Sequence, residues 1–257
     1  MAEALFSTVA VLFLILALKR AREREISFSH LINRNWAIIA KPLIYTLLAG
    51  VFLGIYLLTW WGGLLFVFII FVYLIIQFLI DHLRGKSTEY LCIIGALSFL
   101  IATIMLFPFL GKGSLETIHR ISLPIVILTP LALGGISRLM VNKGLKRAYY
   151  PLALVGLVGV SLAIFYAINP SLLKSMLGYF YVFKPGVTLL TVIEARPLLF
   201  PYGHFTLEIA WLNFTTSFFI SFISLGLLIY AAIKEESADK VLFLVWSIVM
   251  LAAVLGE

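Results

Sequence analysis

The sequence predicts an all-α, polytopic membrane protein with about eight transmembrane helices. Of its 257 residues, 63% are hydrophobic and 12% are charged, against roughly 25% charged residues in an ordinary soluble domain. Apolar runs of about 20 residues recur along the chain, the length that a helix needs to cross a bilayer core about 30 Å thick. The runs are apolar on every side, whereas barrel strands would be about 10 residues long with alternating polar positions. Helices are therefore the expected spanning elements.

Eight apolar runs are the expected spans. In chain order they cover residues 2–18, 43–58, 64–80, 90–109, 121–141, 149–168, 209–233 and 241–255. In the first, the basic cluster follows the apolar run, which favours a retained span over a cleaved signal peptide. Pro124 and Pro130 predict a kink in the fifth, because each ring removes a backbone hydrogen bond. The single cysteine, Cys92, excludes an internal disulfide, and we expect it only to pack.

The basic residues indicate the orientation of these spans. Alternate loops hold 13 of the 19 Lys and Arg residues, while the loops on the other side hold five and Arg138 lies near an inner helix end. Loops rich in Lys and Arg stay in the cytoplasm. We therefore expect a multi-pass protein of the cell membrane with both ends of this chain outside. Asp81 and His82 resemble a metal-binding pair, but we expect them in a solvated inner loop.

The long hydrophilic interruption at residues 169–208 is the expected functional region. We predict one transmembrane domain, residues 1–257, in which this segment forms an external re-entrant or interfacial loop and no soluble C-terminal domain follows. Residues 171–183 can form an interfacial helix. The segment contains Thr191-Val192-Ile193-Glu194. An ionisable residue in a mostly apolar membrane protein is a functional candidate, and the alternative for Glu194 is an interfacial carboxylate paired with Arg196.

Three stretches resemble one family. Thr191-Val192-Ile193-Glu194 is similar to a Thr-Ile-X-Glu motif with valine in the second place, and the stretch from Leu57 to Gly63 is similar to a Leu-Thr-Trp-Gly-Gly turn. The opening from Ala2 to Thr8 resembles the start of a family helix. In these stretches the sequence resembles the catalytic subunit of oligosaccharyltransferase, particularly its archaeal single-subunit form. The resemblance covers essentially the whole chain and implies part of a GT-C type glycosyltransferase membrane domain.

The resemblance also implies an activity. The family transfers an oligosaccharide from a dolichyl phosphate or pyrophosphate carrier to asparagine in Asn-X-Ser/Thr, with a divalent cation, Mn²⁺ or Mg²⁺. Glu194 is then the catalytic residue and a metal ligand, and it contacts the acceptor together with Thr191. Trp60, Trp61 and His204 are the candidates for the lipid-linked donor. No nucleic-acid partner is expected, because the net positive charge of +7 is explained by the basic loops that face the cytoplasm.

The departures from the family pattern predict an incomplete site. Family members carry an acidic residue in the first external loop and an Asp-X-Asp or Asp-X-His pair just before the helix that begins Ala-Glu-Ala. They also carry a soluble domain with Trp-Trp-Asp-Tyr-Gly. Since none of these is present here, we interpret the chain as a central transmembrane fragment. The alternatives are a polytopic membrane transporter and a non-catalytic membrane scaffold subunit.

Overall fold

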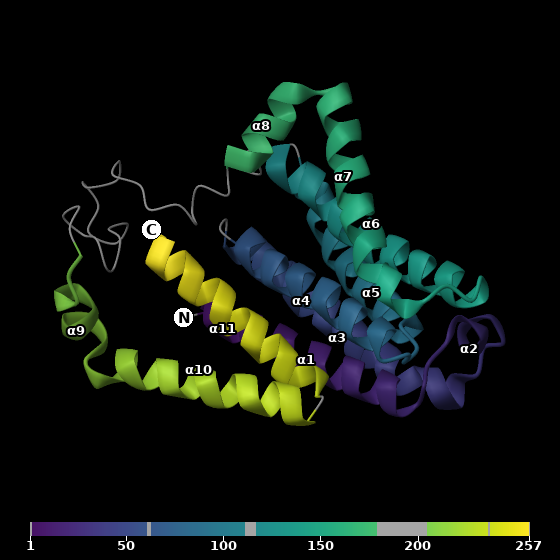
Figure 1. Cartoon of the computed structure of the whole chain (residues 1–257), viewed down its shortest axis with the longest axis horizontal. Coiled ribbons are helices and arrows are strands. Elements are labelled where there is room, and N and C mark those ends of the chain that lie inside the picture. Colours follow the sequence, from purple (N-terminus) through teal and green to yellow (C-terminus); the bar gives the residue numbers. More distant parts are fainter. Residues whose placement is uncertain (1, 61–62, 111–116, 179–204, 236, 257) are drawn as a thin grey trace. The chain divides into compact units, whose positions relative to one another are not determined.

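The computed structural model describes all residues except 1, 61–62, 111–116, 179–204, 236 and 257. It divides into two compact units, Met1–Leu157 and Val158–Glu257, and each is considered by itself. The regular secondary structure of the described residues is helical (Figure 1). The prediction of an all-α protein is confirmed.

The first unit contains the larger part of the helices. It comprises α1 (Ala2–Glu23), α2 (Phe28–Ile32), α3 (Trp36–Thr59), α4 (Leu64–Leu83), α5 (Glu89–Leu106), η2 (Phe107–Phe109), α6 (Thr117–Asn142), η3 (Arg147–Tyr149) and the start of α7 (Tyr150–Ile168). The second unit comprises the rest of α7 with α8 (Pro170–Gly178), α9 (Glu208–Phe214), α10 (Thr216–Glu235) and α11 (Ala238–Gly256). Helix α8 forms the first part of the interfacial helix expected at residues 171–183, and the remainder lies outside the described residues.

Seven helices in the described part of the chain are long and apolar enough to cross a membrane, namely α1, α3, α4, α5, α6, α7 and α10. The eighth expected span coincides with the 19-residue helix α11, which is not among these seven. The helices confirm a multi-pass membrane protein. Pro124 and Pro130 lie inside the continuous helix α6.

Close helix packing in the first unit depends on glycines. Gly50 and Gly54 on α3 face α5 so closely that a Cβ on Gly50 would lie 2.8 Å from Cβ of Ile101. Small residues let transmembrane helices approach in this way, because lipid supplies little hydrophobic drive for association. A Cβ on Gly134 of α6 would meet Cys92 of α5 at 3.0 Å. The buried Cys92 therefore packs, as expected.

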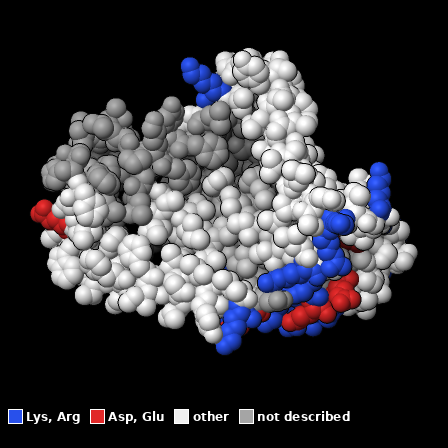
Figure 2. Space-filling view, in the orientation of Figure 1, with Lys and Arg blue, Asp and Glu red and all other residues white. Residues whose placement is uncertain are grey.

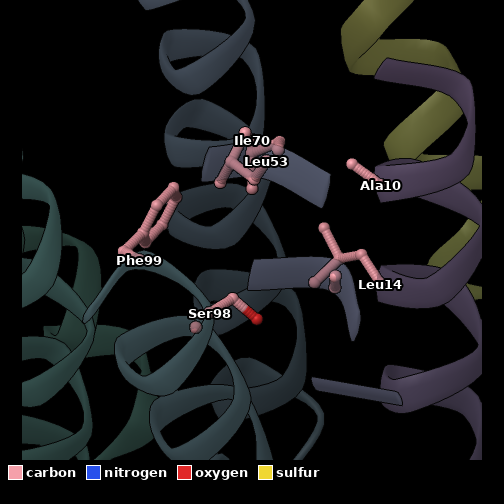
Figure 3. A pocket seen from close by; sticks show the side chains of 8 residues that line it. Ala10, Leu14, Leu53, Ile70, Ser98 and Phe99 are labelled. Carbon is pink, nitrogen blue, oxygen red and sulfur yellow. The ribbon is translucent and has the colours of Figure 1, made fainter. Parts of the chain in front are cut away.

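A small hollow remains between α1, α3, α4 and α5. Its lining residues are Ala10, Leu14, Ala49, Leu53, Ile70, Gly95, Ser98 and Phe99 (Figure 3). Ser98 is the polar side chain among them, and its buried hydroxyl has no hydrogen-bond partner in the described residues. The hollow is otherwise apolar and lies within the helix packing.

Two helices extend beyond the apolar runs that predicted them. Helix α1 continues past residue 18 to Glu23, and α3 begins at Trp36, before Pro42. The predicted bounds at residues 18 and 43 were wrong because hydropathy follows the membrane core, whereas backbone hydrogen bonding continues through Arg and Lys, which are good helix formers. Lys41, expected in a loop, therefore lies in helix α3.

The seventh expected span, residues 209–233, is not one helix. It is interrupted between α9 and α10 at Thr215, whose φ of 50° lies in the left-handed region. A β-branched residue rarely adopts this conformation. The amide of Thr215 still donates to the carbonyl of Trp211 at 2.8 Å, so that α9 ends with its last turn closed.

Asp81 and His82 are buried rather than solvated, which makes the prediction of an inner solvated loop wrong for them. Their exposed fractions are 0% and 3%. Tyr90 Oη donates to Asp81 Oδ2 at 2.6 Å, and Gln77 Nε2 donates to Oδ1 at 3.0 Å. His82 Nδ1 lies 2.8 Å from Ser137 Oγ, and the imidazole stacks on Tyr150. The hydrogen bonds connect α4 with α5 and α6, since a buried polar group has to find partners, and the ring stack connects α4 with the start of α7.

The three basic loops of the first unit converge at one end of its helices. Glu89 Oε2 accepts a hydrogen bond from the Phe28 amide at 2.8 Å, and its other oxygen lies 3.9 Å from Arg138 Nη1. The guanidinium of Arg138 lies over the Phe28 ring. The Arg147 guanidinium packs directly on Gly85. The loops before α3, after α4 and after α6 therefore meet.

We call this region the basic end. Its charged residues are Lys19, Arg20, Arg22, Arg24, Arg34, Lys41, Arg84, Lys86, Arg138, Lys143, Lys146 and Arg147, with Glu23, Glu25, Asp81 and Glu89. Figure 2 shows charged side chains gathered around α2 and the neighbouring turns, while most of the described surface in that view is uncharged. The expected gathering of basic residues on one side is confirmed for this unit.

Candidate functional site at the Trp60 end

Two of the three motif stretches lie at the opposite end of the first unit, which we call the Trp60 end. Helices α1 and α3 run antiparallel, because Phe13 stacks on Tyr45 at a ring distance of 6.3 Å and Phe6 stacks on Phe52 at 6.4 Å. The beginning of α1 is therefore beside the end of α3. The structure brings together the opening stretch and the glycine-containing turn.

Trp60 is held at this end by its neighbours. It forms the C-cap of α3 in extended conformation, and its amide donates to the carbonyl of Tyr56. Its indole meets the Tyr56 ring edge-on at 5.9 Å and remains 40% exposed. The amide of Gly63 donates to the Trp60 carbonyl at 3.1 Å, which closes the turn into α4. Trp60 thus presents an aromatic edge from a fixed backbone, as indoles at a membrane interface do.

Glu3 is a residue at this end that sequence reasoning did not single out. Its side chain is exposed in the first turn of α1, which begins beside the end of α3. Tyr56 itself is 5% exposed and packs edge-on against Phe66 at 5.1 Å. Topology could have indicated Glu3, because the start of the first span and the end of the second span must lie on the same side of the membrane.

The other predicted site residues cannot be placed in this geometry. Trp61, Thr191, Glu194 and His204 lie outside the described residues. The structure therefore places Trp60 and the opening stretch together, and the positions of the acceptor and metal candidates remain predictions.

The described residues alone do not fit a divalent cation. No group of three His, Cys, Asp or Glu side chains among them could hold a metal ion. Glu3 is the carboxylate that the structure describes at the Trp60 end, and Mg²⁺ in proteins is held by one or two carboxylates together with waters and substrate phosphates. The described residues by themselves therefore do not complete a cation site.

Comparison with known proteins gives matches along nearly the whole chain. It is 24% identical over 267 aligned residues to dolichyl-phosphooligosaccharide-protein glycotransferase 3 of Archaeoglobus fulgidus, covering 99% of this chain and 30% of that protein. It is 27% identical over 208 residues to dolichyl-monophosphooligosaccharide–protein glycotransferase AglB of Haloferax volcanii, covering 77% of this chain and 19% of that protein. No protein-family model matches.

Solved structures show the same fold. The Archaeoglobus fulgidus oligosaccharyltransferase in its apo form superposes with a TM-score of 0.80 at 23% identity, over 99% of this chain and 30% of that one. The same archaeal enzyme in complex with an inhibitory peptide and a dolichol-phosphate gives a TM-score of 0.79 at 23% identity, with the same coverage. This chain therefore spans about 30% of the length of the Archaeoglobus protein. In sequence and in fold, the chain is similar to the archaeal oligosaccharyltransferases along nearly its whole length, and it matches about 30% of the Archaeoglobus protein.

Proposed function

We propose that the chain is the membrane core of an oligosaccharyltransferase, which transfers a lipid-linked oligosaccharide to asparagine in Asn-X-Ser/Thr. The observation that carries this proposal is the match over 99% of the chain in both sequence and fold. It is supported by the two motif stretches that meet at the Trp60 end. A transporter would call for polar residues near the midplane of several spans, and Ser98, at the hollow, is a single hydroxyl in an apolar lining.

In this proposal Glu194 and Thr191 serve the acceptor. An amide nitrogen is a poor nucleophile, so the enzyme gains most by holding it in position for attack on the sugar. A carboxylate that accepts hydrogen bonds from the amide N–H groups orients the nitrogen, and we assign this role to Glu194. Thr191, on the same loop, positions that carboxylate or lines the path of the peptide.

Trp60, Trp61 and His204 are assigned to the lipid-linked donor. Trp60 supports this assignment because its indole is partly exposed at the end of a membrane-spanning helix. The carrier's phosphate lies at this depth, where the apolar region of the membrane ends. The carrier is a dolichyl phosphate or pyrophosphate. A dolichol-phosphate is bound in the Archaeoglobus enzyme with which this chain shares its fold.

A divalent cation, Mg²⁺ or Mn²⁺, is proposed as the cofactor. A cation of this kind would neutralise charge on the departing phosphate, and hard oxygen ligands suit both metals. Glu194 is the ligand that we assign in this chain. The described residues do not form a cation site, so Glu194 is the one metal ligand that we assign to a residue of this chain.

The orientation follows from the basic end. We propose that it faces the cytoplasm, following the positive-inside rule, and that the Trp60 end faces outward in the cell membrane. The external loop at residues 169–208 is then on the same side as the Trp60 end, as a reaction on exported polypeptides requires. Both ends of this chain lie outside in this arrangement.

A chimeric enzyme tests the function. The matching region of the full-length Archaeoglobus enzyme is replaced by this chain, and glycosylation of a peptide with an Asn-X-Thr sequon is measured. We expect glycosylated peptide from the chimera. A second peptide with Gln in place of the sequon Asn should stay unmodified. A chimera that inserts into membranes, binds donor lipid and still leaves both peptides unmodified would favour a scaffold subunit.

A further inference from the structure

We propose that the basic end is a binding surface for anionic phospholipid headgroups, with the turn between α6 and α7 as its principal contact. The proposal is independent of the catalytic assignment, since it needs only a multi-pass membrane protein. It rests on three features of the described residues: the geometry of the turn, the lack of carboxylates beside its cations, and the exposed apolar side chains around it.

The turn is a defined structure rather than a loose connection. Gly144 adopts a φ of +64° at the end of α6, where its amide donates to the carbonyl of Val141. The amide of Leu145 donates to the carbonyl of Met140 at 3.0 Å, so α6 ends in the glycine-based motif that commonly closes helices. Lys143 and Lys146 flank this glycine and are exposed. The turn therefore presents two cations from a fixed backbone.

The cations of this turn have no carboxylate partner among the described ion pairs. Of the acidic residues of the basic end, Glu23 pairs with Arg20 and Glu89 lies near Arg138. Glu25 is exposed and belongs to none of the described ion pairs, so it is not paired with the cations of the turn. Asp81 is buried and hydrogen-bonded to Tyr90. The positive charge of Lys143, Lys146 and Arg147 is thus left for an external anion.

Exposed apolar residues beside the cations favour a lipid over a soluble polyanion. In the turn, Leu145 is 48% exposed and Tyr149 is 53% exposed. At the end of α2, Ile32 is 79% exposed, and at the start of α3, Trp36 is 63% exposed. Large apolar side chains next to cations are typical of segments that lie at the headgroup boundary. A nucleic acid would contact the cations and leave the aliphatic side chains of Leu145 and Ile32 exposed to water.

The position of the surface agrees with this partner. The turn joins two helices that are long and apolar enough to cross the membrane, α6 and α7, so its cations lie at the level where a span leaves the hydrocarbon. Lys and Arg near the surface of an anionic leaflet each contribute about 1 kcal/mol to the attraction, equivalent to about fivefold in affinity. Three converging loops add their charges in one place.

The test measures retention of phosphatidylglycerol by the purified chain. Protein in mixed micelles with equal amounts of dioleoyl phosphatidylglycerol and dioleoyl phosphatidylcholine is analysed by native mass spectrometry. We expect preferential retention of phosphatidylglycerol, reduced about fivefold by each of Lys143→Gln and Lys146→Gln. Lys146→Arg, which keeps the charge, should retain the lipid. Arg120→Gln, which removes an exposed cation in the first turns of α6, should have a smaller effect.

Two results would overturn the proposal. One is equal retention of both lipids by the wild-type chain, or an unchanged preference in the Lys143→Gln, Lys146→Gln double variant with native helical content by circular dichroism. The other is displacement of bound phosphatidylglycerol by a short RNA oligonucleotide but not by excess anionic lipid, which would make the surface a nucleic-acid contact.

Discussion

Arg24 supplies the hydrogen-bond donor that Pro42 cannot give to helix α3. Pro42 has no N–H, so the carbonyl four residues earlier, that of Ile38, loses its helical partner. Arg24 Nη1 donates to this carbonyl at 3.0 Å and to that of Ala37 at 2.6 Å. In a membrane protein each backbone carbonyl needs a partner. The turn that follows α1 is thereby tied to the first turn of α3.

This relationship predicts a double-mutant result. Arg24→Ala should lower the free energy of unfolding by about 1 to 3 kcal/mol, because it removes a charged donor from a carbonyl to which Pro42 cannot donate. In a Pro42→Ala background, where residue 42 regains its N–H, the loss should be clearly smaller. The measurement is unfolding of the purified chain in mixed micelles by increasing denaturant.

Arg20→Ala is the matched control. Its guanidinium pairs with Glu23 on the surface, with 51% and 45% of the two side chains exposed, and exposed pairs contribute about 0 to 1 kcal/mol. Equal losses from Arg24→Ala in the wild-type chain and in the Pro42→Ala background would contradict the relationship.

The buried carboxylate of Asp81 gives a second prediction. Tyr90→Phe removes a 2.6 Å hydrogen bond to Asp81 from a site that water does not reach, so it should destabilise the chain by about 1 to 3 kcal/mol. Tyr149→Phe makes the same change on a side chain that is 53% exposed and should alter stability by less than about 0.5 kcal/mol. Thermal unfolding of both variants in detergent compares them, and equal midpoints would argue against a network that holds α4 to α5.

Three glycines should respond differently to alanine. At Gly50 the new Cβ would lie 2.8 Å from Cβ of Ile101 and from the carbonyl oxygen of Ser98, so Gly50→Ala forces α3 and α5 apart at about 1 to 3 kcal/mol. At Gly54 the closest atom is the sulfur of Met105 at 2.7 Å, and a flexible side chain can move away.

Gly135 provides the opposite outcome. Outside the backbone of its own helix, no atom of the described residues lies within 4 Å of a Cβ placed there. Gly135→Ala should therefore stabilise helix α6 by about 0.5 to 1 kcal/mol. The three variants are ranked by unfolding midpoint. A ranking in which Gly50→Ala is as stable as Gly135→Ala would show that α3 and α5 do not pack as described.

The membrane orientation predicts a labelling pattern. Cys92 is 2% exposed, so new cysteines can be read against a low background. In sealed right-side-out vesicles, a membrane-impermeant maleimide should label Thr59→Cys at the Trp60 end and should label Ser29→Cys, at the basic end, only after the vesicles are opened. The reverse pattern would place the Trp60 end in the cytoplasm.

Some of this architecture could be predicted from the sequence, and the reasons are local. Whether a run of residues is apolar enough to enter lipid depends on that run alone. Composition therefore predicts the spans, their number to within one, and the gathering of the basic loops. The beginning of α1 lies beside the end of α3 for a topological reason, since adjacent spans alternate in direction.

Other features depend on contacts between distant residues. Asp81 is in a charged stretch that resembles a solvated loop, but it is buried in the helix packing and hydrogen-bonded to Tyr90 on α5. The early start of α3 depends on Arg24, which offsets the effect of Pro42. The break at Thr215 has no glycine or proline beside it, so hydropathy alone shows one continuous run.

The measurement that tests the central claim most directly is the rate of peptide glycosylation by the chimeric enzyme with Glu194→Gln. If Glu194 orients the acceptor amide, the rate at saturating donor should fall by about 10² or more, as when a group acting on the reacting atoms is lost. Glu208→Gln makes the same change on an exposed residue at the start of α9 and should leave the rate within about twofold. Equal rates for Glu194→Gln and the unaltered chimera would contradict the assignment of this loop to the active site.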